Sequence, residues 1–393
     1  MAIRQSLSGN EAVAYALKQI NPDVFPAFPI TPSTEIPQYF ANYVADGLVD
    51  TEFITVESEH SSMSATISAE AAGARSVTAT SSAGLAFMWE VLPIAAADRL
   101  PAVLALVTRA LSAPININGD HSDSMGARDA GWIQLYAENN QEAYDNMVMA
   151  YRIAEHKSVR LPIMICQDGF ITSHAVQNIE LLSDEEVKAF VGEYRPEHYL
   201  LNKDEVIAVG NYSTSSYYLE ARRAQAEALH NAKKVATEIC DEFGKLTGRY
   251  YDLIEQYRMD DAERAIVIIG STAGTAKDAV DELRETGEKV GLVKIRFFRP
   301  FPAEEIADAL KNVKAVAVMD RSESFSDNGG PLGAETMAAL FRAGSKAKAV
   351  DYIYGLGGRD VTTKDIEKVY ADLSLIIEED DAGETYRYLG VRE

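Results

Sequence analysis

The stretch Pro101-Ala-Val-Leu-Ala-Leu-Val-Thr-Arg109 decides how the first half of this chain folds. Residues 103–107 form an unbroken apolar run, which is typical of a strand buried on both faces, as in a parallel sheet covered by helices. Similar short runs lie at 24–30, 53–56, 76–80 and 163–165, and helical patterns lie at 10–20, 61–72 and 139–153. This alternation predicts a doubly wound α/β domain over residues 1–182.

A second unit of the same kind begins at Ala265. Its predicted strands are 266–269, 290–295 and 313–319, and its predicted helices are 275–286 and 300–310. The segment between the units, 183–264, is charged, and residues 217–243 have the composition of a long polar helix that Gly244 and Gly248 would break. We therefore expect an α/β fold with two doubly wound domains, 1–182 and 265–393, joined by a charged helical connector.

Composition excludes several classes of protein. The 393 residues include 37 Lys and Arg against 60 Asp and Glu, a net charge of −23, which disfavours binding to nucleic acid or to an anionic membrane. Cys166 and Cys240 are the only cysteines and lie far apart, so the chain alone can hold neither an iron–sulfur cluster nor a thiolate zinc site. Two lone thiols, and a first segment without the apolar core of a signal peptide, predict a cytoplasmic protein.

Three motifs follow predicted strands, where ligands bind in parallel sheets. The first is Phe28-Pro-Ile-Thr31-Pro-Ser-Thr34, a proline-framed turn that presents hydroxyl groups at the start of a helix. Hydroxyl and free N–H groups at such a place bind anions. The alternative interpretation, an ordinary helix N-cap, is favoured by the pattern alone.

The second motif, Val56-Glu-Ser-Glu59-His-Ser-Ser62, places two carboxylates and an imidazole directly after a strand. A carboxylate at the end of a buried strand loses water, so its pKa should shift and it could exchange protons. The alternative is that acidic residues favour the first turn of a helix.

The third motif places Arg109 at the end of the strand 103–107. A buried guanidinium needs a partner, and its fork suits a carboxylate ligand. An internal ion pair with Glu59 or Asp120 is an equally good interpretation. His121 matches no standard metal-ligand spacing, so we expect a solvated loop residue there and no metal site on this chain.

Two glycine-rich turns, 270–274 and 355–360, suggest phosphate binding only weakly, because neither is a GxGxxG or Walker motif. The chain also lacks the Gly-Asp-Gly and downstream asparagines that would hold a magnesium diphosphate.

Together with Tyr-Ala-Glu-Asn-Asn-Gln-Glu at 136–142 and Gly-Leu-Gly-Gly-Arg-Asp-Val at 355–361, these motifs resemble the alpha subunits of the 2-oxoacid:ferredoxin oxidoreductase family, to which pyruvate:ferredoxin oxidoreductase belongs. The resemblance is colinear over essentially the whole chain. It implies a thiamine-diphosphate pyrimidine-binding domain at 1–182, a helical connector at 183–264 and a transketolase C-terminal-like domain at 265–393.

The resemblance also implies an activity and partners. The activity is the reversible oxidative decarboxylation of pyruvate with coenzyme A to acetyl-CoA, carbon dioxide and reduced ferredoxin. A beta subunit would hold the diphosphate, magnesium and an iron–sulfur cluster, and gamma and delta subunits would complete the complex with further clusters.

Three residues match functional positions of that family. Glu59 matches the glutamate that hydrogen-bonds the cofactor's pyrimidine nitrogen and thereby favours its imino tautomer. Arg109 matches the arginine that receives the substrate carboxylate, and Thr31 the hydroxyl that orients the same substrate. His60 lies where relatives vary and has no predicted role, and the coenzyme A contacts on this chain are not predicted.

Other functions remain open on the sequence alone. The same scaffold serves branched-chain 2-oxoacids, 2-oxoglutarate and oxalate, and a difference of one methylene is worth only about 1–3 kcal/mol in specificity. A non-catalytic assembly subunit is a second alternative. A self-sufficient NAD-dependent or P-loop enzyme is disfavoured because its fingerprints are absent.

Overall fold

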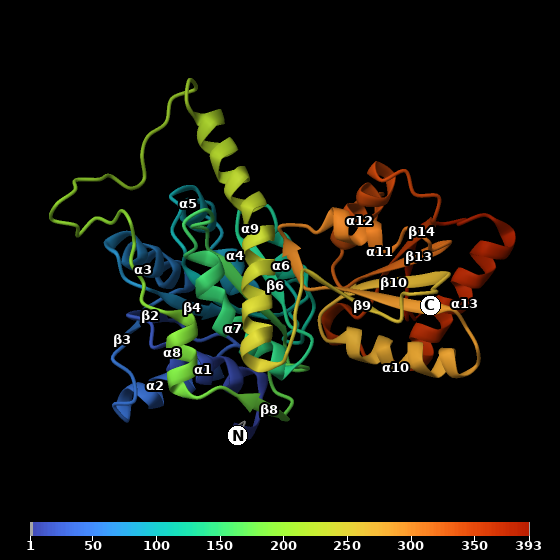
Figure 1. Ribbon diagram of the computed structural model, residues 1–393, viewed down its shortest axis with the longest axis horizontal. Coiled ribbons are helices and arrows are strands. Elements are labelled where there is room, and N and C mark those ends of the chain that lie inside the picture. Colours follow the sequence, from blue (N-terminus) through green and yellow to red (C-terminus); the bar gives the residue numbers. More distant parts are fainter. Residues whose placement is uncertain (1–2, 393) are drawn as a thin grey trace.

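The computed structural model describes residues 3–392 and consists of two α/β halves lying side by side (Figure 1). The helices of the first half are α1 (Gly9–Ile20), α2 (Glu35–Ala45), α3 (Glu59–Ala72), α4 (Ser82–Phe87), α5 (Leu92–Ala97), α6 (Ser122–Gly126) and α7 (Asn140–Ala154). Its strands are β1 (Ile3–Leu7), β2 (Val24–Ala27), β3 (Glu52–Thr55), β4 (Val77–Thr80), β5 (Val103–Thr108), β6 (Ile133–Tyr136), β7 (Ile163–Asp168) and β8 (Gln177–Leu181). The predicted alternation of strands and helices is therefore confirmed.

The central sheet of the first half has the order β12-β6-β7-β5-β4. Strands β4 to β7 are parallel, whereas β12 (Phe297–Arg299) comes from the second half of the chain and runs antiparallel to β6. The sequence did not predict β6 or β12. A parallel pair, β2 and β3, continues beside β4 through a bridge between Val24 and Ser76.

The second half has a six-stranded sheet in the order β15-β14-β13-β10-β11-β9, parallel except for β9. Its strands are β9 (Ile254–Tyr257), β10 (Arg264–Ile269), β11 (Val290–Ile295), β13 (Ala315–Asp320), β14 (Lys348–Ile353) and β15 (Tyr386–Tyr388). Its helices are α10 (Thr272–Glu285), α11 (Ala303–Ala309), α12 (Pro331–Arg342), the short 3₁₀ turn η1 (Leu356–Gly358) and α13 (Thr363–Glu379).

Between the halves lie α8 (Asp184–Val191) and the long helix α9 (Tyr218–Thr247). The prediction that Gly244 breaks this helix is wrong. The helix continues to a left-handed Gly248, and a Cβ on Gly244 would lie 2.3 Å from the ring of Tyr250, so glycine there makes room for an aromatic side chain. Residues 192–217 form an excursion without helix or strand (Figure 1).

The burial of both faces of β5 explains why this strand determines how the first half of the chain folds. Alternate residues of β5 enter different apolar clusters: Val103, Ala105 and Val107 pack with α1, α7 and α9, whereas Leu104 and Leu106 pack with residues of the second sheet. The two sheets thus share one core, while a third cluster lies between the second sheet, α10 and α13.

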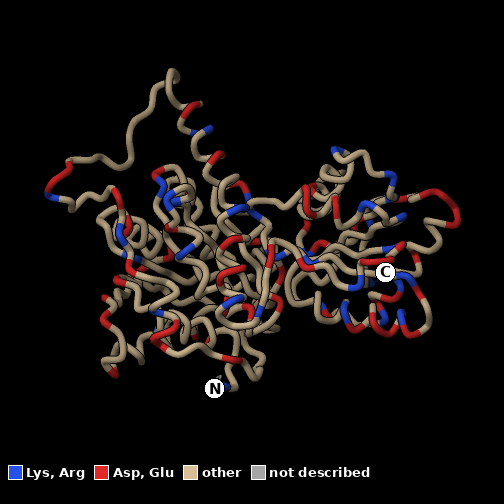
Figure 2. The backbone as a smooth tube through the Cα atoms, viewed as in Figure 1, with Lys and Arg blue, Asp and Glu red and all other residues tan. Residues whose placement is uncertain are grey.

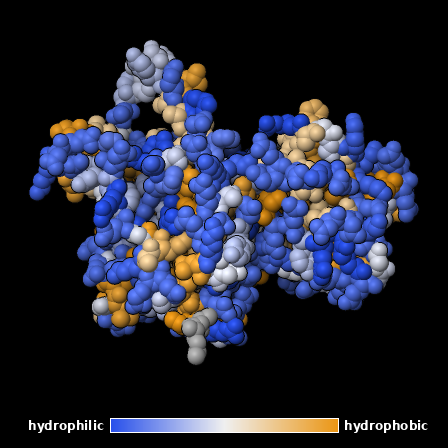
Figure 3. All heavy atoms as spheres, in the orientation of Figure 1, coloured by the Kyte–Doolittle hydropathy of each residue, from blue (hydrophilic) through white to orange (hydrophobic). Residues whose placement is uncertain are grey.

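Charge is spread over both halves, with Lys and Arg lying among the acidic residues (Figure 2). The face seen in Figure 3 is mostly hydrophilic, with separate apolar groups between the polar ones. Within residues 3–392, no helix has the length and apolar character needed to cross a membrane.

Candidate active site

The predicted site residues lie at the carboxyl edge of the strands of the first half. Thr31 follows β2, Glu59 follows β3 at the first turn of α3, and Arg109 follows β5. Because β2 and β3, and β4 and β5, run parallel, these loops emerge on one side.

Glu59 is a buried carboxylate, only 9% exposed, and makes no hydrogen bond or ion pair with any residue in the range 3–392. Thr80 Oγ1 and Ser81 Oγ are buried hydroxyls that also lack a partner within the described chain. Gly84 of α4 gives both neighbours room, because a Cβ there would lie 2.4 Å from Thr80 Oγ1 and 2.9 Å from Glu59 Oε1. The first-turn interpretation explains the position of Glu59, but a buried charge without a partner is costly and indicates a ligand site.

Arg109 is 7% exposed and is held by backbone carbonyls rather than by carboxylates. Nη1 donates to the Thr31 oxygen at 2.9 Å and Nε donates to the Asn116 oxygen at 3.0 Å. Within residues 3–392 no acidic side chain forms an ion pair with it, so the suggested pairs with Glu59 and Asp120 are both wrong. The positive charge of Arg109 remains available for an anionic ligand.

Thr31 is exposed, and its carbonyl connects the turn after β2 to Arg109. The hydroxyl groups of this turn do not cap α2, since Thr34 makes no side-chain capping bond and Ser33 Oγ donates to the Ile30 oxygen. The N-cap interpretation is therefore wrong.

Asp123, which the sequence analysis did not single out, joins the two halves of the site. Its Oδ2 accepts hydrogen bonds from the backbone N–H groups of Ser82 at 2.8 Å and Arg109 at 3.0 Å. Burial raises the pKa of Asp123 to about 8, although these N–H groups favour the ionised form. An Asp in a short polar run, His121-Ser-Asp-Ser, gives no sequence signal for this role.

A second network, of buried polar and charged side chains, connects the two halves of the chain. Asp168, at the end of β7, contacts His121 Nε2 at 2.7 Å, the Ser271 backbone N–H at 2.9 Å and Arg321 Nη1 at 3.0 Å. Burial alone would raise the pKa of Asp168, but His121 and Arg321 hold it well below its usual value. The expectation of a solvated His121 is wrong, because that side chain is 2% exposed.

The two glycine-rich turns receive protein groups instead of phosphate. Gly270 faces Asp168, since a Cβ there would lie 2.8 Å from Asp168 Oδ2. Gly357 packs on the loop that carries Arg109: its N–H donates to Asp120 Oδ2 at 2.9 Å and its oxygen accepts from Asn116 Nδ2 at 2.9 Å. The second half of the chain thus supports the Arg109 loop.

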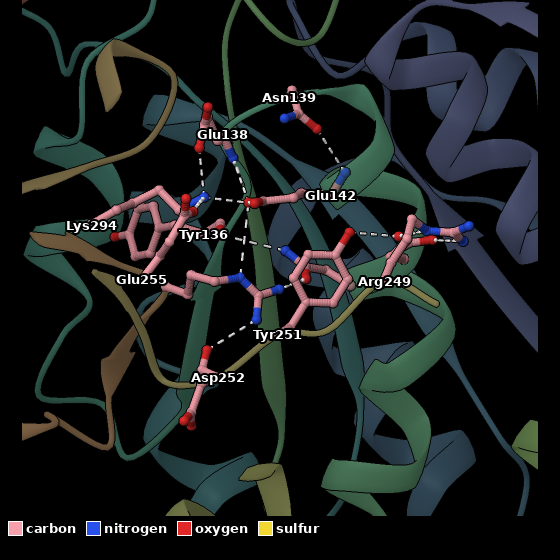
Figure 4. A network of polar contacts seen from close by, with 12 residues as sticks. Tyr136, Glu138, Asn139, Glu142, Arg249, Tyr251, Asp252, Glu255 and Lys294 are labelled. Atoms are coloured by element: carbon pink, nitrogen blue, oxygen red, sulfur yellow. Dashed lines mark hydrogen bonds and ion pairs between the residues drawn. The ribbon is translucent and has the colours of Figure 1, made fainter. Parts of the chain in front are cut away.

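Another charged cluster lies between β11, α7 and β9 (Figure 4). Glu138, Glu142 and Glu255 are close enough together to hold a metal ion, but Lys294 Nζ lies among them at 2.5, 2.7 and 2.5 Å. Burial would lower the pKa of Lys294, yet the three carboxylates raise it above its ordinary value. The ammonium group therefore takes the place that a cation would occupy.

The sequence matches two family models over most of its length. Residues 15–241 match "Pyruvate flavodoxin/ferredoxin oxidoreductase, thiamine diP-bdg", and residues 262–366 match "Pyruvate:ferredoxin oxidoreductase core domain II".

Curated relatives cover nearly the whole chain. Pyruvate synthase subunit PorA of Thermotoga maritima is 51% identical over 393 residues, which cover 99% of this chain and 98% of that relative. PorA of Pyrococcus abyssi is 46% identical over 100% of this chain and 99% of the relative. Ketoisovalerate oxidoreductase subunit VorA of Pyrococcus horikoshii is 44% identical over 96% and 95%.

Solved structures support the fold. A 2-oxoglutarate:ferredoxin oxidoreductase from Magnetococcus marinus matches with a TM-score of 0.72 at 20% identity, over 94% of this chain and 65% of that longer chain. A split-gene transketolase in an inactive beta4 tetramer matches with a TM-score of 0.52 at 12% identity, over 96% of this chain and 99% of that chain. The predicted transketolase-like architecture is confirmed. With family models, full-length relatives and fold in agreement, this chain belongs to the pyruvate flavodoxin/ferredoxin oxidoreductase family.

Proposed function

We propose that this chain is the alpha subunit of a multisubunit pyruvate:ferredoxin oxidoreductase, or pyruvate synthase. The complex converts pyruvate and coenzyme A reversibly to acetyl-CoA and carbon dioxide while ferredoxin is reduced. The observation that carries the proposal is the pair of buried charges, Glu59 and Arg109, that have no charged partner within residues 3–392. Both lie at one sheet edge of a chain that matches PorA subunits almost end to end.

The residues around Glu59 fit the aminopyrimidine ring of thiamine diphosphate. That ring carries hydrogen-bond donors and acceptors, and this part of the chain offers a buried carboxylate and the buried hydroxyls of Thr80 and Ser81 without partners of their own. When bound, the cofactor supplies the nucleophilic carbon and the electron sink that decarboxylation needs.

Glu59 would hold a proton at the ring nitrogen of that aminopyrimidine. Its low exposure excludes water that would compete for the same hydrogen bond, and a low-dielectric environment strengthens the bond. Gly84 lets α4 pack directly against the Glu59 carboxylate, which limits the movement of that side chain.

Arg109 would bind the carboxylate of the 2-oxoacid. Two carbonyls fix the guanidinium through Nε and Nη1, and Nη2 makes no hydrogen bond to another described residue, so one edge of the fork is available. Thr31, tied to Arg109 through its carbonyl, would place its hydroxyl beside the same substrate.

Partner subunits would complete the site. We infer that a beta subunit holds the diphosphate, magnesium and an iron–sulfur cluster, and that gamma and delta subunits carry electrons to ferredoxin. Both cysteines of this chain are buried and free, which suits clusters on other chains and a reducing cytoplasm. Phe87 at the end of α4, Trp89 just after it and Ile115 in the loop after β5 are 55, 45 and 78% exposed, so they would lie under such a partner.

A ketoisovalerate oxidoreductase subunit is the second candidate function, because the VorA relative is 44% identical over 96% of this chain. The two substrates differ by two methyl groups at the carbon next to the oxo group, and discrimination per methylene is only about 1–3 kcal/mol. Comparing pyruvate with 2-oxoisovalerate in the same purified complex separates the two candidates.

The test uses the complex purified under anaerobic conditions, with the wild-type chain or the variants Glu59→Gln and Glu52→Gln. Glu52 is an exposed residue at the start of β3 and serves as the matched control. We expect Glu59→Gln to lower pyruvate- and coenzyme A-dependent dye reduction at least about 100-fold, and Glu52→Gln to leave it unchanged. Full activity of a correctly assembled Glu59→Gln complex would contradict the proposed role, and a higher kcat/KM for 2-oxoisovalerate would contradict the substrate.

A further inference from the structure

A half-open cavity of about 530 Å³ lies at the opposite edge of the first sheet from Glu59 and Arg109. Its walls come from the end of α3, the turn before β5, the turn before β7, and the excursion 192–217 that runs past α3 in Figure 1. Glu70 on this wall is eleven residues along α3 from Glu59, or about 16 Å at the rise of an α-helix.

Three Arg and Lys side chains, Arg99, Lys157 and Arg160, line the cavity and outnumber the carboxyl groups of Asp98 and Glu70 in the same wall. Arg99 donates to the backbone oxygens of Val159 and Arg160, and within the described range neither Arg99 nor Lys157 pairs with a carboxylate. Among residues 3–392, the Arg160 guanidinium pairs with one carboxylate, Glu197 Oε2 at 3.3 Å, and that glutamate side chain is 68% exposed. In a chain of net charge −23, such a group of cations around a cavity favours an anionic ligand.

The backbone around these cations is unusual as well. Arg99 and Arg160 both have left-handed conformations, with φ of 61° and 45°, which non-glycine residues rarely adopt. Such strained residues are concentrated at binding sites, where surrounding contacts hold them in place.

Glu70 supplies a second and independent observation. Its side chain is 3% exposed; Oε1 accepts from the Ser76 N–H at 2.7 Å and from Ser76 Oγ at 3.0 Å, whereas Oε2 is buried without a partner in residues 3–392. Burial raises the pKa of Glu70 to about 8, although Ser76 and the wall residue Tyr194 favour its ionised form. The carboxyl group is therefore mostly neutral at pH 7 and can donate a hydrogen bond without repelling an anion.

The remaining walls are mixed, with the polar residues Asp98, Tyr194, His198 and Asn211 lying among apolar ones. Ala71, Leu100 and Pro101 line the inner side, and Ile207 and Val209 of the excursion line the outer side. In residues 205–210 half-buried and exposed positions alternate, as expected for an extended segment laid across the cavity. The volume lies in the range of small-molecule sites, and the largely polar lining suits a charged ligand better than an apolar one.

We propose that this cavity binds a phosphorylated small molecule, with its phosphate held between Arg99, Lys157 and Arg160 and a hydroxyl or amino group hydrogen-bonded to Glu70. A phosphate ester fits better than a monocarboxylate, because its two negative charges and several oxygens can engage three cations at once.

The test is calorimetric titration of the intact complex with ADP, pyrophosphate and adenosine. We expect ADP and pyrophosphate to bind once per alpha chain and to compete with each other, and adenosine to bind far more weakly. Arg160→Gln should weaken ADP binding about tenfold or more, since it removes a charge-assisted contact. Arg195→Gln is the matched control, because Arg195 belongs to the same excursion but pairs with Glu193 on the surface and does not line the cavity.

Several results would overturn the proposal: no binding of ADP or pyrophosphate, equal binding of adenosine, or wild-type affinity in a folded Arg160→Gln complex. A thermal unfolding midpoint equal to that of the wild type shows that the variant complex is folded. A competition arm with coenzyme A, itself a phosphate ester, identifies the source of the ligand. Displacement of ADP by coenzyme A that Arg160→Gln weakens in parallel assigns the cavity to coenzyme A, and its failure to displace ADP assigns the cavity to another phosphorylated metabolite.

Discussion

At the scale of single residues, Arg109 shows how a buried charge can be fixed in place without being neutralised. Backbone carbonyls of Thr31 and Asn116 hold the guanidinium, and each lies on a different loop. Carbonyl dipoles orient an arginine but carry no net charge, so a substrate carboxylate would be its first full counter-ion.

We expect Arg109→Gln to raise the KM for pyruvate by about 10- to 100-fold, because a charge-assisted hydrogen bond is worth roughly 1.5–3 kcal/mol. The effect on kcat should be smaller, since the carboxylate is bound before and during the reaction. Steady-state kinetics of the complex measure both constants. Arg223→Gln, on the exposed side of α9, should change neither. A KM within twofold of wild type would show that Arg109 does not bind the substrate.

At the scale of elements, the position of the short helix α4 is set by hydrogen bonds to distant residues, which its own sequence does not predict. Its N-terminal Ser82 donates its N–H to Asp123 and its hydroxyl to the Ala110 oxygen at 2.5 Å. Helix α4 is therefore fixed to the Arg109 loop at one end, while Gly84 lies against Glu59. Helix α4 therefore fixes the position of Glu59 relative to Arg109.

The substitution Gly84→Ala tests this arrangement. The added methyl would lie 2.4 Å from Thr80 Oγ1 and 2.9 Å from Glu59 Oε1, so either the helix or the carboxylate must move. We expect about tenfold or greater loss of apparent affinity for thiamine diphosphate, because one displaced hydrogen bond to a charged group is worth roughly 1.5–3 kcal/mol. Reconstitution of the cofactor-depleted complex measures it.

Gly126→Ala is the matched control for that experiment. Gly126 also lies in a short helix, α6, but a Cβ there would meet nothing within 4 Å. If both variants bind the cofactor like the wild type, Gly84 is not needed for close packing against Glu59.

The same elements show what the sequence could predict. The strands β5, β7, β10 and β11 are buried on both faces, so their apolar runs reveal them directly. Strand β6 contains Gln134, whose Nε2 donates to the Ser124 oxygen, and a polar residue conceals a buried strand from pattern analysis. Strand β12 exists because Phe297 pairs with Leu135, a partner more than 150 residues away in the chain that no local pattern reveals.

The three site residues proposed from the sequence remain predictions, and the pattern that indicates them is local. Thr31, Glu59 and Arg109 stand directly after strands, where residue type and position both indicate ligand binding. His121 and Asp123 lie at the start of the short helix α6, and their roles come only from contacts with distant residues. The ends of buried strands are therefore visible in a single sequence, whereas the loops that meet in space are not.

At the scale of the whole molecule, the two halves are joined by buried charges as well as by a shared apolar core. Asp168 of the first half accepts from Ser271 and Arg321 of the second, and its own half contributes His121. Both Asp168 and Arg321 are nearly inaccessible, at 1 and 3% exposed. Removing one member of such a pair leaves the other charge buried and uncompensated, which is more costly than removing both.

Asp168→Asn should therefore destabilise the protein by about 3–5 kcal/mol at neutral pH. The pKa of Asp168 in the folded chain lies well below its ordinary value, so this stabilisation is fully present above the ordinary pKa and is lost only as the pH falls through the folded value. The difference in thermal midpoint between wild type and Asp168→Asn should accordingly be the same at pH 6 and pH 8. Glu227→Gln removes an exposed pair with Arg223 and should cost less than about 1 kcal/mol. If Asp168→Asn costs no more than this control, the network around Asp168 does not help to join the two halves and serves only to position the loop that carries Arg109.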